Sequence, residues 1–350
     1  MAKEKTNNKW FKVKVVIFIV IASLCAVSFI WQNQLEKWIN YVYNPEISSD
    51  VLACELRMHF IDIGQGDSIA IELPDNKIMV IDAGPGKSEQ TLVNYLNNAI
   101  FANRENKVID YFIVTHQDED HIGGADKIFD NFEIKNFYRP NVYNSYEIER
   151  DGLIIPAKNI CNTQVFNTMI EKMEAENCEN IVVNSVYEDM PYLDANCGYD
   201  IEFLSPIDQT YSDANNYSPI IILTYQNRKI MLTGDAETKV ENQVLNAYSA
   251  SELKVDVLKL GHHGSSTSTS ENFLNAVNPT YAVICVGEGN KYNHPTESVL
   301  ERVTNKLGSH NVYRTDINSN IIFGIDADEI SNGKGTIKIS VNGQIGRAHV

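Results

Sequence analysis

The stretch that decides the fold is "THQDEDHIGG", Thr115–Gly124, which directly follows the apolar run "VIDYFIV", Val108–Val114. The run predicts a buried β-strand, and Gly123 and Gly124 predict a tight turn of the backbone after it. Side chains that bind metal ions occupy four positions of the stretch, namely His116, Asp118, Asp120 and His121. We expect the first two to hold one divalent ion and the last two to hold a second, since so crowded a set of ligands suits two ions about 3.5–4 Å apart.

Further candidate residues follow other apolar runs. Asp235 in "MLTGDAE" is expected to bridge both ions with one carboxylate, and His262 and His263 in "LKLGHHGSS" come after the next run. The predicted metal ligands are His116, Asp118, Asp120, His121, Asp235 and His263, and the predicted catalytic residues are Asp120, Asp235 and His294 in "YNHPTE". Asp62 and Asp82 also follow apolar runs, and we expect them to orient the ligating histidines.

The chemistry of these residues indicates metal-dependent hydrolysis. Water held between two divalent ions has its pKa lowered from about 16 towards 7, which makes it a nucleophile at neutral pH. A catalytic lysine is then unnecessary, and we expect none in these motifs. Asp118, Asp120 and Asp235 are carboxylates, and oxygen ligands shift the preference from zinc towards manganese. The predicted cofactors are therefore two divalent metal ions, Zn or Mn.

Plainer explanations apply to motifs taken singly. "HHGS" alone is more often a turn than a site, and "IDAG" is common at strand ends, so the hypothesis depends on several such segments occurring together. His59 and His310 are interpreted as structural or surface residues, and Ser265–Ser270 as a loop. Serine hydrolysis has no support, because the chain lacks a G-x-S-x-G motif.

The composition is that of an acidic globular chain. Of its 350 residues 43% are apolar, which is enough for a substantial core. The net charge of −17 repels phosphate backbones, so any contact with nucleic acid must be local and metal-mediated. The six cysteines form no C-x-x-C pair, which argues against a structural zinc site. Lone thiols are favoured over one disulfide among Cys161, Cys178 and Cys197.

A membrane anchor is predicted near the N-terminus. Five lysines precede "VVIFIVIASLCAVSFIW", Val15–Trp31, which carries no charge and is long enough to span a bilayer. Lysines on this side predict a cytoplasmic N-terminus and an extracytoplasmic remainder; a cleaved signal peptide and a buried helix are the alternatives. The predicted organisation is residues 1–14 cytoplasmic, 15–31 transmembrane helix, 32–53 linker, 54–342 hydrolase domain, and 343–350 a tail interpreted as a truncated reading frame or a non-native extension.

Short apolar runs closed by turn residues fill the rest of the chain. Strands are expected within 56–86, with a hairpin turn at "PDNK", and within 108–116, 199–237, 255–265 and 279–287, with a last strand pair in "NGKGTIKISVNG". Helices are expected at Ser88–Phe101, Ala125–Phe132, Cys161–Cys178, Glu237–Ala247 and Thr296–Leu307, and an irregular segment after Phe132. This layout predicts an α/β fold with two β-sheets packed face to face and helices outside.

The motifs together resemble a known family. "THQDEDHIGG" is similar to the H-x-H-x-D-H signature of the metallo-β-lactamase superfamily, in the variant H-x-D-x-D-H. With "FIDIGQGDSIAI", "FLSPIDQTYSDANNYSPIIIL", "MLTGDAE", "VLKLGHHGSS" and "NHP", the chain resembles the C-terminal hydrolase domain of the ComEC competence family over roughly residues 56–307. The resemblance implies an αββα sandwich, a binuclear metallohydrolase, and a phosphodiesterase or nuclease role with DNA as substrate and competence or transport proteins as partners.

One ligand of the superfamily has no counterpart here. No histidine occurs from Ile122 to Gly261, so Asn216, Ser218 or a water molecule is expected in the place of the third histidine. Three functions stay open: an anchored phosphodiesterase acting on nucleic acid, a hydrolase of a cell-wall phosphodiester or of an acyl or lactam bond, and a non-catalytic metal-binding partner of a membrane channel. The oligomeric state is open as well.

Overall fold

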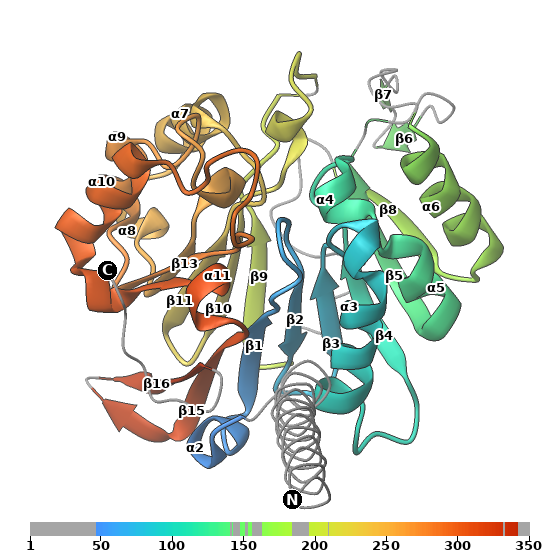
Figure 1. Ribbon diagram of the computed structural model, residues 1–350, viewed down its shortest axis with the longest axis horizontal. Coiled ribbons are helices and arrows are strands. Elements are labelled where there is room, and N and C mark those ends of the chain that lie inside the picture. The colour runs from blue at the N-terminus through green and yellow to red at the C-terminus, as the bar shows by residue number, and fades with distance from the viewer. Residues whose placement is uncertain are drawn as a thin grey trace, which may run out of the picture.

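The computed structural model describes residues 47–140, 142, 148–150, 153–155, 163–183, 196–208, 210–331 and 333–341. Two β-sheets lie face to face, with helices on both outer faces, as Figure 1 shows. The predicted αββα sandwich is therefore confirmed. Among the described residues no helix is both long and apolar enough to cross a membrane. The predicted anchor Val15–Trp31 and the tail 343–350 lie outside the described residues.

The first sheet has eight strands and the second has six. The first runs in the order β16 (Lys334–Val341), β15 (Ile321–Ser331), β1 (Leu56–Phe60), β2 (Ile69–Glu72), β3 (Ile78–Ile81), β4 (Val108–Ile113), β5 (Glu133–Pro140) and β8 (Glu179–Val183). The second runs in the order β14 (Val312–Arg314), β13 (Tyr281–Ile284), β12 (Val257–Lys259), β11 (Arg228–Leu232), β10 (Ile221–Tyr225) and β9 (Tyr199–Phe203). A separate hairpin pairs β6 (Ile148–Arg150) with β7 (Leu153–Ile155).

Helices cover each sheet from outside (Figure 1). Beside the first sheet lie α3 (Glu89–Tyr95) with its π-helical continuation Leu96–Ile100, α4 (Glu119–Ile122), α5 (Ala125–Asn131) and α6 (Gln164–Ala175). Beside the second lie α7 (Thr238–Ala247), α8 (Ala250–Leu253), α9 (Glu271–Val277) and α10 (Glu297–Leu307), while α2 (Ser49–Leu52) and α11 (Thr315–Asn318) are short peripheral turns.

Alternation along the strands builds two cores. In β2, Ile69 and Ile71 belong to the core between the two sheets, whereas Ala70 belongs to the core under the helices. In β3, Met79 points between the sheets and Val80 towards the helices. Successive side chains of a strand face opposite sides, so each strand of the first sheet contributes to both layers. The sandwich is consequently held by apolar burial on both faces of each sheet.

Parallel pairing decides where the chemistry gathers. Strands β3, β4, β5 and β8 run parallel, and so do β11, β12, β13 and β14. Carboxyl ends of parallel strands meet at one edge of a sheet, and ligand sites of α/β proteins form there. The segments that follow β3, β4, β11, β12 and β13 therefore converge on one edge of the sandwich.

Several predicted elements are confirmed and others are wrong. The predicted helix Ser88–Phe101 is present as α3 and its π-helical continuation, and the "PDNK" turn joins β2 to β3. The segment after Phe132, expected to be irregular, forms strand β5, because Ile134 and Phe137 pack into the helix-covered core. The last strand pair is wider than expected and joins β15 to β16. Among the described cysteines, Cys54, Cys178, Cys197 and Cys285 are free thiols.

Candidate metal centre

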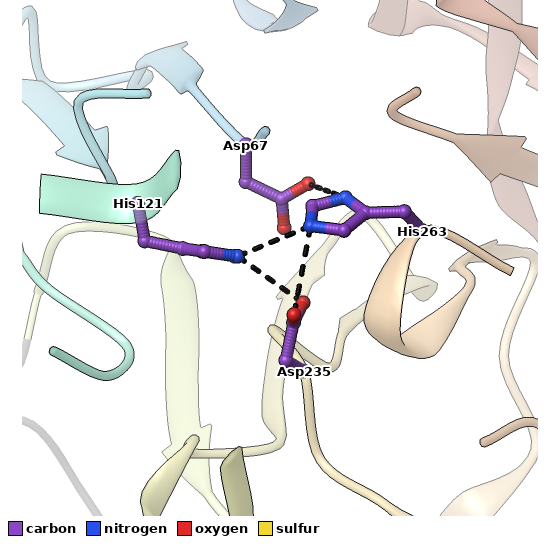
Figure 2. A group of neighbouring side chains, drawn as sticks. All are labelled: Asp67, His121, Asp235 and His263. Atoms are coloured by element: carbon purple, nitrogen blue, oxygen red, sulfur yellow. Dashed lines mark hydrogen bonds and ion pairs between the residues drawn. The ribbon is translucent and has the colours of Figure 1, made fainter. Parts of the chain in front are cut away.

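The strand-end segments of both sheets bring a cluster of histidines and carboxylates together. Asp67 precedes β2, His121 follows β4, and Asp235 and His263 follow β11 and β12. Figure 2 shows these four side chains pointing towards a common centre. Each offers a ligand atom, and the four atoms lie within 4.8 Å of one another. The cluster therefore combines side chains from both sheets, although these residues lie far apart in the sequence.

Asp235 stands in the middle of the cluster. Its Oδ1 lies 3.3 Å from Nε2 of His121, and its Oδ2 lies 3.8 Å from Nε2 of His116 and 3.5 Å from Nε2 of His263. Its backbone N–H donates to Oγ of Ser218 at 3.1 Å, which fixes the turn that presents the carboxylate. One carboxylate therefore faces three imidazoles from two different sheets.

The remaining predicted ligands sit on either side of Asp235. Oδ2 of Asp118 lies 3.8 Å from Nε2 of His116, and Oδ2 of Asp120 lies 3.5 Å from Nε2 of His263. The side chain of Asp118 is 50% exposed and that of Asp120 is 25% exposed, whereas His116 is fully buried. The structure brings all six predicted ligands into one cluster, with the carboxylates of Asp118 and Asp120 at its solvent side.

Each ligating histidine is fixed through its outer nitrogen. His121 Nδ1 donates to Oδ2 of Asp82 at 2.8 Å, and His263 Nδ1 donates to the carbonyl oxygen of Cys285 at 2.9 Å. His116 Nδ1 lies 3.2 Å from Oγ1 of Thr115 and 3.4 Å from Oγ of Ser218. Such bonds at Nδ1 set the tautomer and leave the lone pair of Nε2 directed inwards, which is the arrangement of metal-ligating histidines.

The atoms that face the centre fit a divalent cation. Nε2 of His116 and Oδ1 of Asp235 are buried and make no hydrogen bond to any described residue. Nε2 of His121 and Nε2 of His263 face each other at 3.3 Å, and two lone pairs at that distance require a proton or a cation between them. Imidazole and carboxylate ligands suit zinc and manganese alike. The donor set therefore fits the predicted ions.

Burial and the charges of neighbouring side chains together set the pKa values of the cluster. Burial, followed by the charge of His121, lowers the pKa of His116 to about 3. Burial also disfavours charge on His263, but the carboxylates of Asp235 and Asp67 outweigh burial and raise its pKa to about 10. Burial raises the pKa of Asp235, yet the nearby histidines hold it well below its usual range. The centre thus concentrates negative charge that protons or metal ions neutralise.

A buried ion pair behind His263 was missed by the sequence analysis. Lys259 in "VLKLGHHGSS" is fully buried and forms an ion pair with Asp67, and its Nζ also donates to the carbonyl oxygen of Gly234 at 3.0 Å. Asp67 in turn lies 3.2 Å from Nδ1 of His263. A lysine flanked by apolar residues on a buried strand was the signal available in the sequence.

The charge of Lys259 sets the state of Asp67. Burial raises the pKa of Asp67, but the charges of Lys259 and His263 dominate and lower it to about 2. Asp67 is thus an anion already paired to a buried cation. It positions the outer nitrogen of His263 and the neighbouring backbone, while the inner nitrogen of that histidine faces the centre.

The residues predicted to orient the ligands have divided roles. Asp82 contacts His121 as expected, and Ser218 contacts the outer nitrogen of His116 rather than the centre. Asp62 contacts no ligating histidine: it accepts from the backbone N–H of Gly64 and from Oγ of Ser319, because the loop after β1 turns it away. The expectation for Asp62 is therefore wrong. Nδ2 of Asn216 lies 3.4 Å from a carboxylate oxygen of Glu237, so its contact is outside the ligand cluster.

Two further histidines border the cluster. Nε2 of His262 lies 3.6 Å from Oδ2 of Asp235, and its Nδ1 lies 3.2 Å from Oγ1 of Thr267. The ring of His294 stands 5.6 Å from the ring of His262 at 80°. His262 and His263 both adopt positive φ, 49° and 52°, and such strained backbone is retained where function requires it. The strained pair directs its two side chains to different parts of the cluster.

The glycines behind the ligands are needed for a different reason than expected. Gly123 has φ −56° and Gly124 has φ −95°, so neither adopts a conformation reserved for glycine. A Cβ on Gly123 would instead collide with the backbone of Gly86 and of Glu119. Close packing of α4 against the loop after β3, rather than a tight turn, excludes a side chain here.

Comparisons with known proteins identify a family and several relatives. Residues 61–288 match the family described as "Metallo-beta-lactamase superfamily". ComE operon protein 3 of Bacillus subtilis is 30% identical over 290 residues, which cover 77% of this chain and 33% of that protein. Competence protein ComA of Neisseria gonorrhoeae is 39% identical over 141 residues, covering 40% and 19%, and Recombination protein 2 of Haemophilus influenzae is 30% identical over 248 residues, covering 69% and 26%. The chain spans a third or less of the length of these relatives.

Proposed function

This chain belongs to the metallo-beta-lactamase superfamily and is similar to competence proteins, and from that premise we propose that it is a metal-dependent phosphodiesterase that acts on nucleic acid at the outer side of a cell membrane. The superfamily is one of metal-dependent hydrolases, and a candidate metal site is present in the described residues. The observation that carries the proposal is the position of Asp235. Its single carboxylate lies close to the inward-facing Nε2 atoms of three histidines, which come from both sheets.

The chain's own residues have distinct tasks in this proposal. His116, Asp118 and Asp235 would hold one cation, and Asp120, His121, His263 and Asp235 would hold the other. When bound, two such cations supply Lewis-acid neutralisation of the phosphate and a water molecule of lowered pKa. Asp82 and Ser218 keep the outer nitrogens of His121 and His116 occupied, so that the inner nitrogens stay available.

His262 is the side chain that best takes the place of the missing third histidine. Its Nε2 lies 3.6 Å from the same Asp235 oxygen that lies 3.8 Å from Nε2 of His116. Ser218, expected in that role, occupies the outer nitrogen of His116 instead. The tandem histidines would thus serve one cation each, His262 beside His116 and His263 beside His121. His294, which touches the ring of His262, remains the candidate for protonating a leaving group.

The substrate and the location rest on independent support. One relative is named Competence protein ComA and another Recombination protein 2, which supports DNA as substrate and competence or transport proteins as partners. The uncharged run Val15–Trp31 and the lysines before it support a single-pass anchor with the hydrolase domain outside the cytoplasm. Carboxylates among the ligands support manganese beside zinc as the metal.

A metal and substrate panel tests the proposed function. Purified protein, stripped and reloaded with Mn²⁺ or Zn²⁺, is expected to hold close to two ions per chain and to cleave single-stranded DNA and bis(p-nitrophenyl) phosphate. A β-lactam assayed alongside is expected to stay intact. The proposed phosphodiesterase activity would be overturned if the protein bound no metal after reloading, or if it hydrolysed only the β-lactam.

A further inference from the structure

A cavity of about 630 Å³ lies directly beside the candidate metal centre. Asp118 and Asp120 line it, and so does the loop that follows β13, which includes Tyr292. Its volume falls within the range of roughly 300–1,000 Å³ that small-molecule sites occupy. The cavity is therefore large enough for one nucleotide unit next to the ligands.

Aromatic rings connect this cavity with the metal centre. Tyr292 is 50% exposed, and its ring lies 5.7 Å from that of His294 with the planes 25° apart. His294 in turn meets His262 edge to face, and His262 faces Asp235. A partly stacked, solvent-facing ring presents a flat apolar surface on which another planar group can lie.

The loop holds Tyr292 in place before any ligand arrives. Asn290 acts as its centre: Nδ2 donates to the carbonyl oxygens of Gly287 at 3.0 Å and His294 at 2.6 Å. Oδ1 of Asn290 accepts from the backbone N–H groups of Tyr292 at 3.2 Å and His294 at 3.0 Å. Four hydrogen bonds from one side chain pre-organise the loop, which lowers the entropy cost of binding.

The cavity is lined by mixed charges, so it does not offer a basic surface that could bind a phosphate backbone. Lys87 and Lys291 line it, but so do Glu119 and Glu288 in addition to the two aspartates of the centre. Nζ of Lys291 lies 4.9 Å from the ring centroid of Tyr292, which is within the range of a cation–π contact. With at most these two lysines available for phosphates, affinity must come from the metal ions and from stacking.

We propose that Tyr292 is a stacking platform for an unpaired nucleobase adjacent to the phosphodiester held at the metal centre, so that the substrate is single-stranded. This role rests on the proposed function, because Tyr292 would hold the nucleic-acid substrate of the proposed phosphodiesterase. A base paired in a duplex has both faces covered by its neighbours, so only an unstacked base can lie on this ring.

Binding of matched oligonucleotides tests the platform. Fluorescein-labelled decathymidylate and an abasic decamer of the same length are titrated with the full chain in Ca²⁺, by anisotropy, and gels confirm that the oligonucleotide stays intact. Tyr292→Ala is expected to weaken decathymidylate binding about tenfold, in keeping with the loss of one stacked base, and to leave the abasic decamer unchanged. Tyr292→Phe, which keeps the ring, is expected to retain wild-type affinity.

The possible outcomes separate a failure of the stacking role of Tyr292 from a failure of the proposed function. Equal affinity of Tyr292→Ala and wild type for decathymidylate, or an equal loss for both oligonucleotides, would overturn it. A slope of log affinity against log salt steeper than about −3 would also overturn it, because such a slope requires four or more phosphate contacts. If wild type binds through Tyr292 yet cleaves no phosphodiester in Mn²⁺ or Zn²⁺, the proposed function fails and the platform stands.

Discussion

At the scale of single residues, Asp235 decides whether two cations can lie close together. Its two oxygens face different imidazoles, and its backbone is fixed by Ser218 and by the buried strand β11 that precedes it. A charge placed so firmly needs no reorganisation when substrate arrives, which is the condition under which electrostatic stabilisation is largest.

Asp235→Asn tests this residue. The amide keeps the shape but removes the negative charge that offsets repulsion between the cations, so we expect loss of at least one ion per chain and a fall in turnover of at least roughly a hundredfold. Metal analysis after dialysis and the rate on bis(p-nitrophenyl) phosphate measure both effects, while circular dichroism checks the fold. The exposed His310→Ala is the control and should match wild type. An Asn variant with both ions and a normal rate would remove Asp235 from the site.

Lys259 is the second residue with a testable role. It is fully buried, and its partner Asp67 is only 2% exposed, so its removal leaves a buried carboxylate without a cation. Lys259→Met is expected to lower the free energy of unfolding by about 3–5 kcal/mol, measured by urea denaturation. Lys254→Met, an exposed lysine just before β12, should change it by less than about 0.5 kcal/mol. Part of the loss should return when Asp67→Asn is added; equal stability of all variants would contradict the assignment.

At the scale of elements, a partly buried ionic network joins β1 to β2. Nε and Nη2 of Arg57 donate to the two carboxylate oxygens of Glu72, both at 2.7 Å, and Nε2 of His59 lies 3.2 Å from Oε1. Nδ1 of His59 lies 2.8 Å from the hydroxyl oxygen of Tyr95 on α3. His59 is thus structural, as the sequence indicated, and links the sheet to the helix above it.

Acid unfolding should report this network. Burial raises the pKa of Glu72, but the bonds from His59 and Arg57 outweigh burial and lower it from 4.5 to about 2. Because the folded pKa is the lower one, the stabilisation is fully present above pH 4.5 and is lost as the pH falls through about 2. The difference corresponds to about 3 kcal/mol.

Glu72→Gln should therefore be less stable at neutral pH and lose less stability between pH 4.5 and 2 than wild type, as urea unfolding at successive pH values will show. Glu133→Gln, an exposed glutamate on β5, is the matched control and should keep the wild-type slope. Parallel pH profiles for wild type and Glu72→Gln would contradict the role of the network.

At the scale of the whole molecule, the overall negative charge of the chain contrasts with the local attraction for phosphate proposed at the metal centre. The net charge is −17, yet the proposed substrate is a polyanion. A divalent centre at one edge, beside a cavity whose platform is aromatic, concentrates attraction where chemistry occurs and leaves the remaining surface repulsive. Nonspecific retention of duplex nucleic acid is thereby disfavoured.

The proposed orientation in the membrane is also a whole-molecule property. Lysines before Val15 favour the cytoplasm, so an alkaline phosphatase fused after Val341 should be active in intact cells. The same reporter fused after Lys14 should be inactive, because this enzyme folds only outside the cytoplasm. The reverse pattern would place the hydrolase domain inside and exclude extracytoplasmic substrates.

The sequence by itself determined the ligand types, their strand-end positions and the layered architecture. His116, Asp118, Asp120 and His121 lie within one short segment, so their proximity is a local property of the chain. Alternating and continuous apolar runs likewise report burial residue by residue, which is why the two-sheet sandwich was predictable. Asp235 and His263 could be predicted as ligands because the carboxyl ends of parallel strands converge at one edge of a sheet.

Only the tertiary structure decided which distant segments touch. Asp67 meets Lys259, Asp62 turns away from the histidines, and Tyr292 extends the row of rings that ends at His262, because two sheets pack with a particular strand order. Pairing between residues far apart in the chain leaves no periodic pattern in either segment, so no local signal encodes it. Burial of Lys259 is the clearest case: its strand is apolar by sequence, but the carboxylate that makes a buried cation tolerable comes from the opposite sheet.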